Sequence, residues 1–252
     1  MSGLVVTVLL VNSDGASAAD IDSSYKSAGL DKYVYKHQAS GSWPTLQKMI
    51  DDGTRLVTFV TAVDSSTPET SYLLDEWSYI FENPYDVTSS DEFTCTPDRP
   101  DSVKGNAAAA VQSGKLPFMN HFLYQTGILD IETPNASYVG TTNAPSGGTG
   151  NLGDAATKCT QEYGRQPAFI LVDFFNEGPA IETVDKLNKV TNAVGRKELS
   201  SSQTSGGSTY SNVFRGLVQM VNQAKSGSNP STADWIWVGG DWGSLLGGGI
   251  SI

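Results

Sequence analysis

The sequence is poor in the residues that build metal centres and histidine-based active sites. Its 252 residues include only two histidines and two cysteines, which excludes a histidine-rich metal centre. The sequence also has no P-loop, dinucleotide-binding fingerprint or G-x-S-x-G elbow, so three common kinds of nucleotide-binding and hydrolytic site are excluded. It has no run of 18 apolar residues, and we therefore predict no membrane-spanning helix.

Basic residues are scarce as well. The chain has 16 Lys and Arg against 27 Asp and Glu, a formal net charge of −11. This balance disfavours long-range attraction to nucleic acids and to anionic membrane surfaces, and we expect neither as a partner. A local cationic pocket remains compatible with the sequence, because arginines are scattered along it, at Arg55, Arg99, Arg165 and Arg196.

Four apolar runs, each ending in a polar residue, dominate what is present. They are Leu4–Asn12, Arg55–Thr61, Pro117–Tyr124 and Ala168–Asn176. Near-continuous apolar strands have both faces buried, as in a parallel sheet covered by helices. Open α/β sheets and barrels place ligands at the carboxyl ends of such strands. Two weaker strands are predicted at Tyr33–His37 and Trp235–Gly239.

Helical patterns alternate with these strands, which predicts an α/β fold. The expected helices are Ala16–Ser27 capped by Asp14, Trp43–Asp51 capped by Ser42, Tyr72–Phe81, and a stripe from Ile181 to Val194. We expect one packed domain over residues 1–196 and a Ser/Gly-rich linker and tail over 197–252. A complete eight-stranded barrel takes roughly 250 residues, so these strands amount to about half a barrel.

The amino-terminal run has a second interpretation, as a secretory signal peptide. Leu4–Val11 is apolar, and Ala16-Ser17-Ala18 has small residues of the cleavage type. However, no Lys or Arg precedes the run, and polar residues separate it from the small ones. We therefore favour a buried strand over a signal peptide.

Two further features depend on the compartment. In a secreted protein, Cys95 and Cys159 can close one disulfide worth about 4 kcal/mol, whereas in the cytosol they would be two thiols. Asn135-Ala136-Ser137 is an acceptor sequence for N-glycosylation within a polar loop. Together these features favour secretion.

Asp173 is the strongest candidate for a site residue. It lies near the end of an apolar strand, where an ionised carboxylate is costly unless it is paired or bound to a ligand. Strand alternation places Asp173 on the same side as Leu171 and Phe175. The alternative is a carboxylate satisfied by an arginine or by backbone amides.

The other candidates have competing structural roles. His121 lies within the third run, where it is either a site residue or a hydrogen-bonded core residue, and His37 lies in a polar stretch. Asn12, at the end of the first run, can bind a substrate hydroxyl, whereas Asp14 fits a helix cap. Arg55 opens the second run, where it can meet a phosphate.

Three acidic residues raise the paired-carboxylate chemistry of glycosidases. Glu76, Glu82 and Asp86 are predicted on a helix and the loop after it, so we expect them to be solvated or capping. A retaining glycosidase that pairs Asp173 with one of these acids remains a rival hypothesis.

Six segments in a fixed order resemble a known family. They are VVTVLLVNSDG, SWPTLQKMIDDGTRLVTFV, YLLDEWSYIFENPYDV, FTCTPDRP, LPFMNHFLY and KCTQEYGRQPAFILVDFFNEG. Over residues 3–195 the chain resembles the C-terminal half of the fungal PLC-like phosphodiesterases, relatives of the phosphatidylinositol-specific phospholipase C X domain. The resemblance implies an incomplete, distorted TIM-type (β/α) barrel and a secreted or cell-surface protein. It also implies cleavage of a phospholipid or an inositol or glycerol phosphodiester, with no cofactor, although a Ca²⁺ requirement is compatible with the family.

The catalytic residues that the family implies belong to its first strands. One His acts as base and a second as acid, while an Arg and an Asp stabilise the phosphorane, from G-A-H-N-like and D-G-x-R segments. The first segment and the second His do not occur here. Asp52-Gly53-Thr54-Arg55 matches the D-G-x-R pattern, but it precedes a later strand (RLVTFV), whereas the family segment belongs to the first strands of the barrel. We therefore expect the N-terminal half of the barrel to be missing and the chain to be weak or inactive alone.

The resemblance carries a few roles over to this chain. Asp173 matches a late-strand acid that lines the pocket, and Phe175 stands where relatives usually have tyrosine. Arg55 and His121 match positions that face or flank the pocket, and Cys95 and Cys159 match cysteines that form a disulfide. The alternative function is a non-catalytic headgroup-binding or surface protein.

Overall fold

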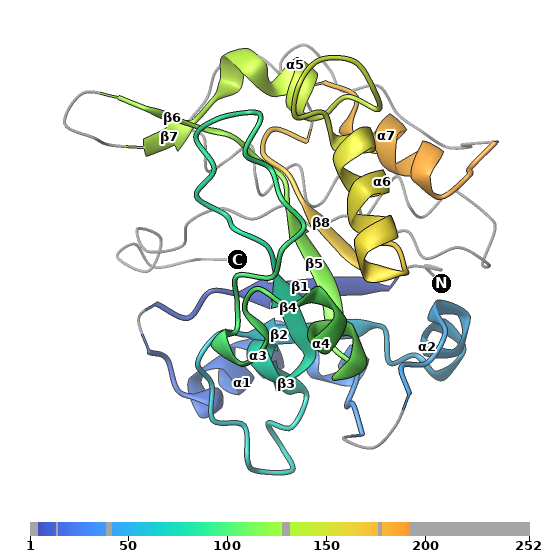
Figure 1. The fold of residues 1–252 in the computed structure, drawn as a ribbon. Coiled ribbons are helices and arrows are strands. Elements are labelled where there is room, and N and C mark those ends of the chain that lie inside the picture. Colours follow the sequence, from blue (N-terminus) through green and yellow to red (C-terminus); the bar gives the residue numbers. More distant parts are fainter. Residues whose placement is uncertain (1–4, 14, 39–41, 128–131, 176–177, 192–252) are drawn as a thin grey trace, which may run out of the picture. The chain divides into compact units, whose positions relative to one another are not determined.

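The computed structural model describes residues 5–13, 15–38, 42–127, 132–175 and 178–191 (Figure 1). These residues fall into two compact units, one ending at Tyr79 and one beginning at Ile80. The predicted tail, the predicted strand Trp235–Gly239 and the cap residue Asp14 lie outside the described residues.

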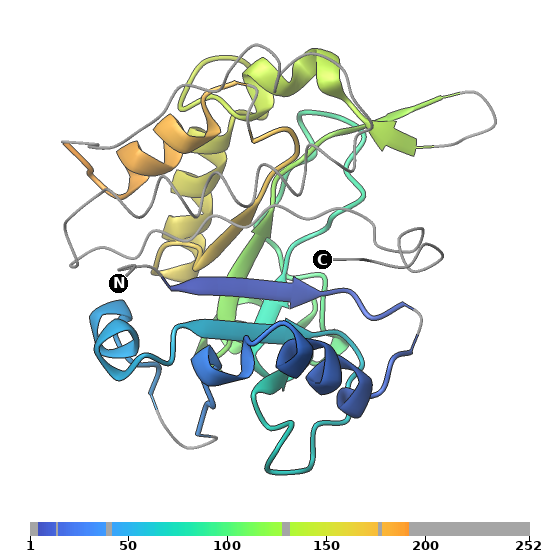
Figure 2. The same ribbon diagram turned by 180° about the vertical axis from the view of Figure 1, so that it is seen from behind.

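The first unit is built on three parallel strands in the order β1 (Val6–Leu10), β2 (Leu56–Val60) and β3 (Leu73–Asp75). Figure 2 shows β1 and β2 side by side, in register from Val6 opposite Leu56 to Leu10 opposite Val60. Helix α1 (Ala18–Ser27) contributes apolar side chains to the core on one face of this sheet. This is the buried parallel sheet that the apolar runs predict.

The helix starts of the first unit differ from the predicted ones. Ser17 caps α1 and forms a capping box with Asp20. Helix α2 (Leu46–Asp52) is capped by Thr45 rather than Ser42, because Trp43 stacks on the ring of His37 instead of joining the helix. The predicted strand Tyr33–His37 is reduced to one bridge from Val34 to Leu56, after the short helix η1 (Asp31–Tyr33).

The predicted helix Tyr72–Phe81 is wrong. The segment forms β3, then the one-turn helix α3 (Glu76–Tyr79), then β4 (Ile80–Glu82). Strand pairing decides this outcome, since Leu73 pairs with Thr58 and Ile80 with Leu116. Backbone hydrogen bonds to neighbouring strands outweigh a helical spacing of apolar residues.

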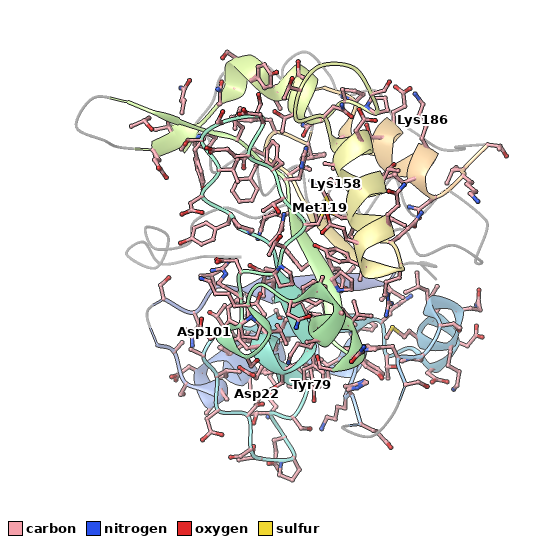
Figure 3. All side chains as sticks on the ribbon, viewed as in Figure 1. Asp22, Tyr79, Asp101, Met119, Lys158 and Lys186 are labelled. Atoms are coloured by element: carbon pink, nitrogen blue, oxygen red, sulfur yellow. A yellow bond between two sulfur atoms is a disulfide. The ribbon has the colours of Figure 1, made fainter. Side chains whose placement is uncertain are left out.

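The second unit is also built on three parallel strands, in the order β4, β5 (Leu116–Asn120) and β8 (Phe169–Leu171). One face packs against α4 (Ala107–Gln112), α6 (Leu152–Tyr163) and α7 (Ala180–Leu187). Phe81, Met119 and Ile170 enter this core from the three strands, and Figure 3 marks Met119 on β5. Their side chains define the helix-covered face of the sheet.

Shorter elements follow the strands of the second unit. They are η2 (Asp101–Val103), the two-stranded ribbon of β6 (Tyr124–Thr126) and β7 (Glu132–Pro134), η4 (Ala136–Tyr138) and α5 (Val139–Thr142). Helix α7 ends well before Val194, because Asn188 caps it and Lys189 takes a left-handed φ of 57°.

The α/β class and the parallel strands are confirmed. The described residues form two separate three-stranded parallel sheets and the small ribbon, with no closed barrel among them.

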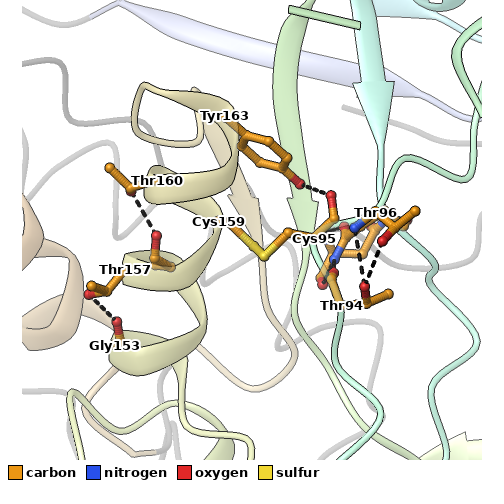
Figure 4. The surroundings of a disulfide bond; sticks show 11 residues. Thr94, Cys95, Thr96, Gly153, Thr157, Cys159, Thr160 and Tyr163 are labelled. Carbon is orange, nitrogen blue, oxygen red and sulfur yellow. Dashed lines mark hydrogen bonds between the residues drawn. A yellow bond between two sulfur atoms is a disulfide. The ribbon is translucent and has the colours of Figure 1, made fainter. Parts of the chain in front are cut away.

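The disulfide that the resemblance implies is confirmed. Cys95 and Cys159 are bonded, with their Cα atoms 5.1 Å apart and a separation of 64 positions in the sequence. Figure 4 shows that the bond ties the loop after β4 to α6, where Tyr163 also donates a hydrogen bond to the Cys95 carbonyl at 2.6 Å. Closing a loop of this length lowers the conformational entropy of the unfolded state, which stabilises the folded state by about 4 kcal/mol.

Replacing both cysteines by serine should therefore lower the free energy of unfolding by about 2–5 kcal/mol. Urea unfolding with and without reductant measures this. Reductant should destabilise the unmodified chain and leave the double variant unchanged; equal midpoints for the oxidised chain and the variant would contradict the expectation.

Candidate functional site

The carboxyl ends of β4, β5 and β8 gather polar residues at one edge of the second sheet. Side chains alternate along a strand, and the register pairs Glu82 with Phe118 and Asn120 with Leu171. Glu82 and Asn120 therefore lie on the face opposite the helix-covered one, and Asp173 follows two residues after Leu171. Parallel α/β folds place their ligands at this edge. We call Glu82, Asn120, Asp173 and the neighbouring Arg99 the carboxyl-edge site.

Glu82 is held by an ion pair with Arg99. The two residues form an antiparallel bridge, in which Glu82 N–H donates to the Arg99 carbonyl at 2.9 Å. Bridge partners share a face, and the guanidinium Nη2 meets the carboxylate Oε2. The Glu82 side chain is 3% exposed and that of Arg99 is 37% exposed. The buried charge of Glu82 is therefore compensated, while the Arg99 side chain is partly exposed.

The aromatic ring of Tyr85 also contacts the guanidinium of Arg99. Its centroid lies 4.4 Å from the guanidinium carbon, a cation–π contact. Glu82 and Tyr85 together fix the orientation of the guanidinium.

Two asparagines lock the ends of β4 and β5 together. Asn83 Oδ1 accepts from the backbone N–H of Asn120 at 2.6 Å, and Asn83 Nδ2 donates to the Asn120 carbonyl at 3.1 Å. The Asn83 side chain thus continues the ladder where the strand stops. Asn120 Nδ2 in turn donates to Glu82 Oε2 at 3.2 Å, so the asparagines and the ion pair form one buried network.

The expectation that Glu76 and Glu82 are solvated or capping is wrong. Both are buried, Glu76 at the start of the one-turn helix α3 and Glu82 in β4. Glu82 is buried because strand β4 takes the place of the end of the predicted helix. Asp86 is exposed, in line with the expectation for it.

Asp173 has an uncompensated carboxyl oxygen. Its Oδ2 atom is buried and has no hydrogen-bond partner among the residues that the structure describes. Burial raises the pKa of this carboxyl to about 6. The backbone here is fixed separately, since Asn143 Nδ2 donates to the carbonyls of Asp173 and Phe174 at 3.1 and 3.4 Å. The ionised carboxylate of Asp173 can therefore accept a hydrogen bond, and the carboxyl group can donate one when it is protonated at mildly acidic pH.

The strand ends before Asp173 for a local reason. Phe174 takes a left-handed φ of 47°, which breaks the extended conformation, and β8 stops at Leu171 rather than continuing to Asn176. Phe175 then turns into the helix-covered core, where it is buried with Phe81 and Ala180. It does not accompany Asp173.

His121 lies on the helix-covered side of β5 and is 0% exposed. Its Nε2 lies 3.0 Å from the Thr142 carbonyl and 3.1 Å from the Gly150 carbonyl. Carbonyls only accept, so Nε2 carries the proton. Burial lowers the pKa of His121 to about 4. The imidazole is therefore neutral and fastens the loop from Thr142 to Gly150 to β5.

Asn12 and Arg55 lie in the first unit, at opposite ends of its strands. Asn12 follows β1. Its Oδ1 accepts a hydrogen bond from the Ala16 N–H at 2.8 Å, and its Nδ2 donates to the Ala16 carbonyl at 3.0 Å. Arg55 precedes β2 and lies over the ring of Tyr33, 5.1 Å from its centroid. The structure does not bring these two candidates together.

His37 belongs to an aromatic cluster of the first unit. Its ring stacks on Trp43 with centroids 4.1 Å apart, and Nδ1 lies 3.1 Å from the Tyr35 hydroxyl. Burial lowers the pKa of His37, which favours the neutral ring. These contacts describe a packed side chain.

The sequence interpretation identified Asp173 but missed Arg99, Asn83 and the role of Asn120. Two signals were available, namely the polar pair Glu82-Asn83 directly after an apolar pair, and the arginine in the segment that follows Cys95. Neither signal indicates which distant strand these side chains join.

A calcium site does not fit the described residues. Ca²⁺ requires six to eight oxygen ligands, and no group of three or more His, Cys, Asp or Glu in this part of the chain is placed to hold a metal. Glu82 is already paired with Arg99, which leaves Asp173 as a single carboxylate.

Glu82→Gln should lower the free energy of unfolding by roughly 2–4 kcal/mol, because it leaves the guanidinium without its buried counter-charge. Asp98→Asn is the matched control, since it breaks an exposed ion pair with Lys104 in the same loop and should cost less than about 1 kcal/mol. Chemical denaturation of both variants measures the difference, and equal losses would contradict a structural role for Glu82.

The stability of the chain should fall as the Asp173 carboxyl ionises. Its pKa is raised from 3.8 to about 6 in the folded state, so both states are protonated below pH 4, and the unfolded state ionises first as pH rises. This group should therefore cost about 1–3 kcal/mol of stability between pH 4 and pH 7. Asp173→Asn should remove that part of the pH dependence, and parallel pH profiles of the two proteins would refute it.

Comparisons with known proteins identify the family of this chain. Residues 2–188 match the family described as PI-PLC X 1. "PI-PLC X domain-containing protein 1" of Arthroderma benhamiae is 33% identical over 188 residues, which cover 73% of this chain and 58% of that protein. "Uncharacterized secreted protein" of the same organism is 33% identical over 198 residues, 74% of this chain and 43% of that protein.

The chain thus spans about half the length of these curated relatives. No solved structure gives a significant match. The family match covers residues 2–188, which include every helix and strand from β1 to α7, and the chain therefore belongs to the PI-PLC X family.

Proposed function

We propose that the carboxyl-edge site binds the hydroxylated headgroup of a phosphodiester, as part of a PI-PLC X-type phosphodiesterase. One observation carries this proposal. Among the residues that the structure describes, Asp173 keeps a buried carboxyl oxygen without a hydrogen-bond partner, at the edge of the sheet where α/β folds bind ligands. A polyol hydroxyl is a donor that this oxygen accepts.

Arg99 supplies the positive charge of the site. Its side chain is partly exposed and its guanidinium contacts Glu82 and Tyr85, an arrangement suited to a phosphate oxygen. Asn120 bonds Glu82 and so keeps the ion pair in place. Asp173 and Arg99 would then bind the hydroxyls and the phosphate of one small headgroup.

Proton transfer is the part of the reaction that this chain does not supply. Phosphodiester cleavage by this family's chemistry uses one base and one acid close to the phosphate. The sequence has two histidines, and His121 is buried against two carbonyls while His37 is packed among aromatic rings. We therefore propose that this chain binds headgroups and hydrolyses them weakly or not at all. A non-catalytic headgroup-binding protein is the second candidate, supported by the same burial of His121.

The proposal includes an incomplete, distorted TIM-type barrel. Each of the two units contains a three-stranded parallel sheet, and parallel strands are what such a barrel requires. The greater length of the two relatives supports an incomplete barrel.

The proposal also includes a location outside the cell or at its surface. A disulfide persists in oxidising compartments, and this chain has one. One relative is named a secreted protein.

Myo-inositol 1-phosphate should bind the chain, and Asp173→Asn should weaken the binding roughly 10-fold or more, because it removes a hydrogen bond to a charged group. Isothermal titration measures both. Asp86→Asn is the control, since Asp86 is an exposed acid shortly after β4 and its loss should leave the affinity unchanged. Equal affinities for the unmodified chain and Asp173→Asn would refute the site.

Phosphatidylinositol vesicles and water-soluble glycerophosphoinositol should both remain uncleaved by the 252-residue chain. Release of inositol phosphate is the measurement. Rapid turnover would overturn the role given to the histidines, and cleavage of nitrophenyl glycosides that depends on Asp173 would favour the glycosidase hypothesis instead.

A further inference from the structure

We propose that Asn135 carries an N-linked glycan. The inference rests on the extracellular location proposed above and is independent of the carboxyl-edge site. Asn135-Ala136-Ser137 is the single N-x-Ser/Thr acceptor without proline at x in the whole sequence. Sequence alone cannot separate it from a chance match, so its surroundings decide.

The backbone of Asn135 forms two hydrogen bonds, whereas its side-chain nitrogen forms none with the described residues. The residue lies between β7 and η4, and its N–H donates to the Leu123 carbonyl at 2.7 Å. Its carbonyl accepts from the Tyr138 N–H at 3.2 Å. The nitrogen that would carry the sugar, Nδ2, has no partner among the described residues.

The acceptor serine is in contact with the asparagine. Ser137 Oγ donates to Asn135 Oδ1 at 2.7 Å. This bond holds Asn135 and the acceptor serine on one side of the turn. Ala136 and Ser137 are exposed, so the folded protein has room for a bulky substituent here.

The transfer would follow the ordinary chemistry of this modification. Nδ2 forms a bond to C1 of N-acetylglucosamine and loses one proton. The bond from C1 to the pyrophosphate oxygen of a polyisoprenyl-linked oligosaccharide breaks, and the pyrophosphate leaves with the electron pair. No oxidant or reductant is involved.

A glycan at this position has a structural use. The ribbon of β6 and β7 has three pairs, from Tyr124 opposite Pro134 to Thr126 opposite Glu132, and it is exposed apart from Tyr124. Two-stranded ribbons are marginal, and their open edges invite pairing with other chains. A bulky, hydrated group attached directly after β7 hinders such pairing.

The test uses the full chain, secreted from a eukaryotic host behind a cleavable leader and recovered from the medium. Intact mass is measured before and after treatment with a peptide-N-glycosidase, and the peptide that contains position 135 is sequenced. We expect the mass to fall on treatment and aspartate to appear at 135. Asn135→Gln and Ser137→Ala should both lose the glycan, whereas Ser137→Thr should retain it.

Protein recovered from the medium has passed the transferase, so an unmodified Asn135 in that protein would overturn the proposal. Retention of the mass difference in Asn135→Gln would overturn it as well. Neither result would bear on headgroup binding, which is measured by titration on Asp173 variants.

Discussion

The buried ion pair of Glu82 and Arg99 is the interaction on which the second unit depends. It joins the end of β4 to the segment after Cys95 on one side and, through Asn120, to the end of β5 on the other. A carboxylate buried without its guanidinium would cost several kcal/mol. Formation of the sheet edge and formation of the pair are therefore one event, and the site is set up by the fold itself.

Asp173 differs from Glu82 in a way that separates function from stability. Both are acids at the carboxyl edge, yet Glu82 is compensated and Asp173 is not. A buried oxygen without a hydrogen bond lowers the stability of the folded state. A ligand that donates a hydrogen bond to this oxygen removes that desolvation penalty, which favours binding. This contrast is the reason why we propose ligand recognition for Asp173 and a structural role for Glu82.

The sequence predicted strands within the four apolar runs, because near-continuous apolar segments are a strong signal, and it drew attention to Asp173 as an acid within one of them. It could not decide between Asn120 and His121, since both faces of a buried strand are apolar and alternation alone does not identify which face the helices cover. It failed for Tyr72–Phe81, where the helical spacing of Leu73, Trp77 and Ile80 was overridden by pairing with distant strands. The strand ends were shorter than predicted because side chains such as Asn83 take over the hydrogen bonds.

The bond between Cys95 and Cys159 has a further consequence for a protein exposed to proteases. A single cleavage at any peptide bond between these two positions produces two fragments that remain covalently joined. The segment so protected contains β5 and the ribbon of β6 and β7. Nicked protein would thus keep both halves of the β4–β5–β8 sheet at high effective concentration, and damage in this loop would become visible only after reduction.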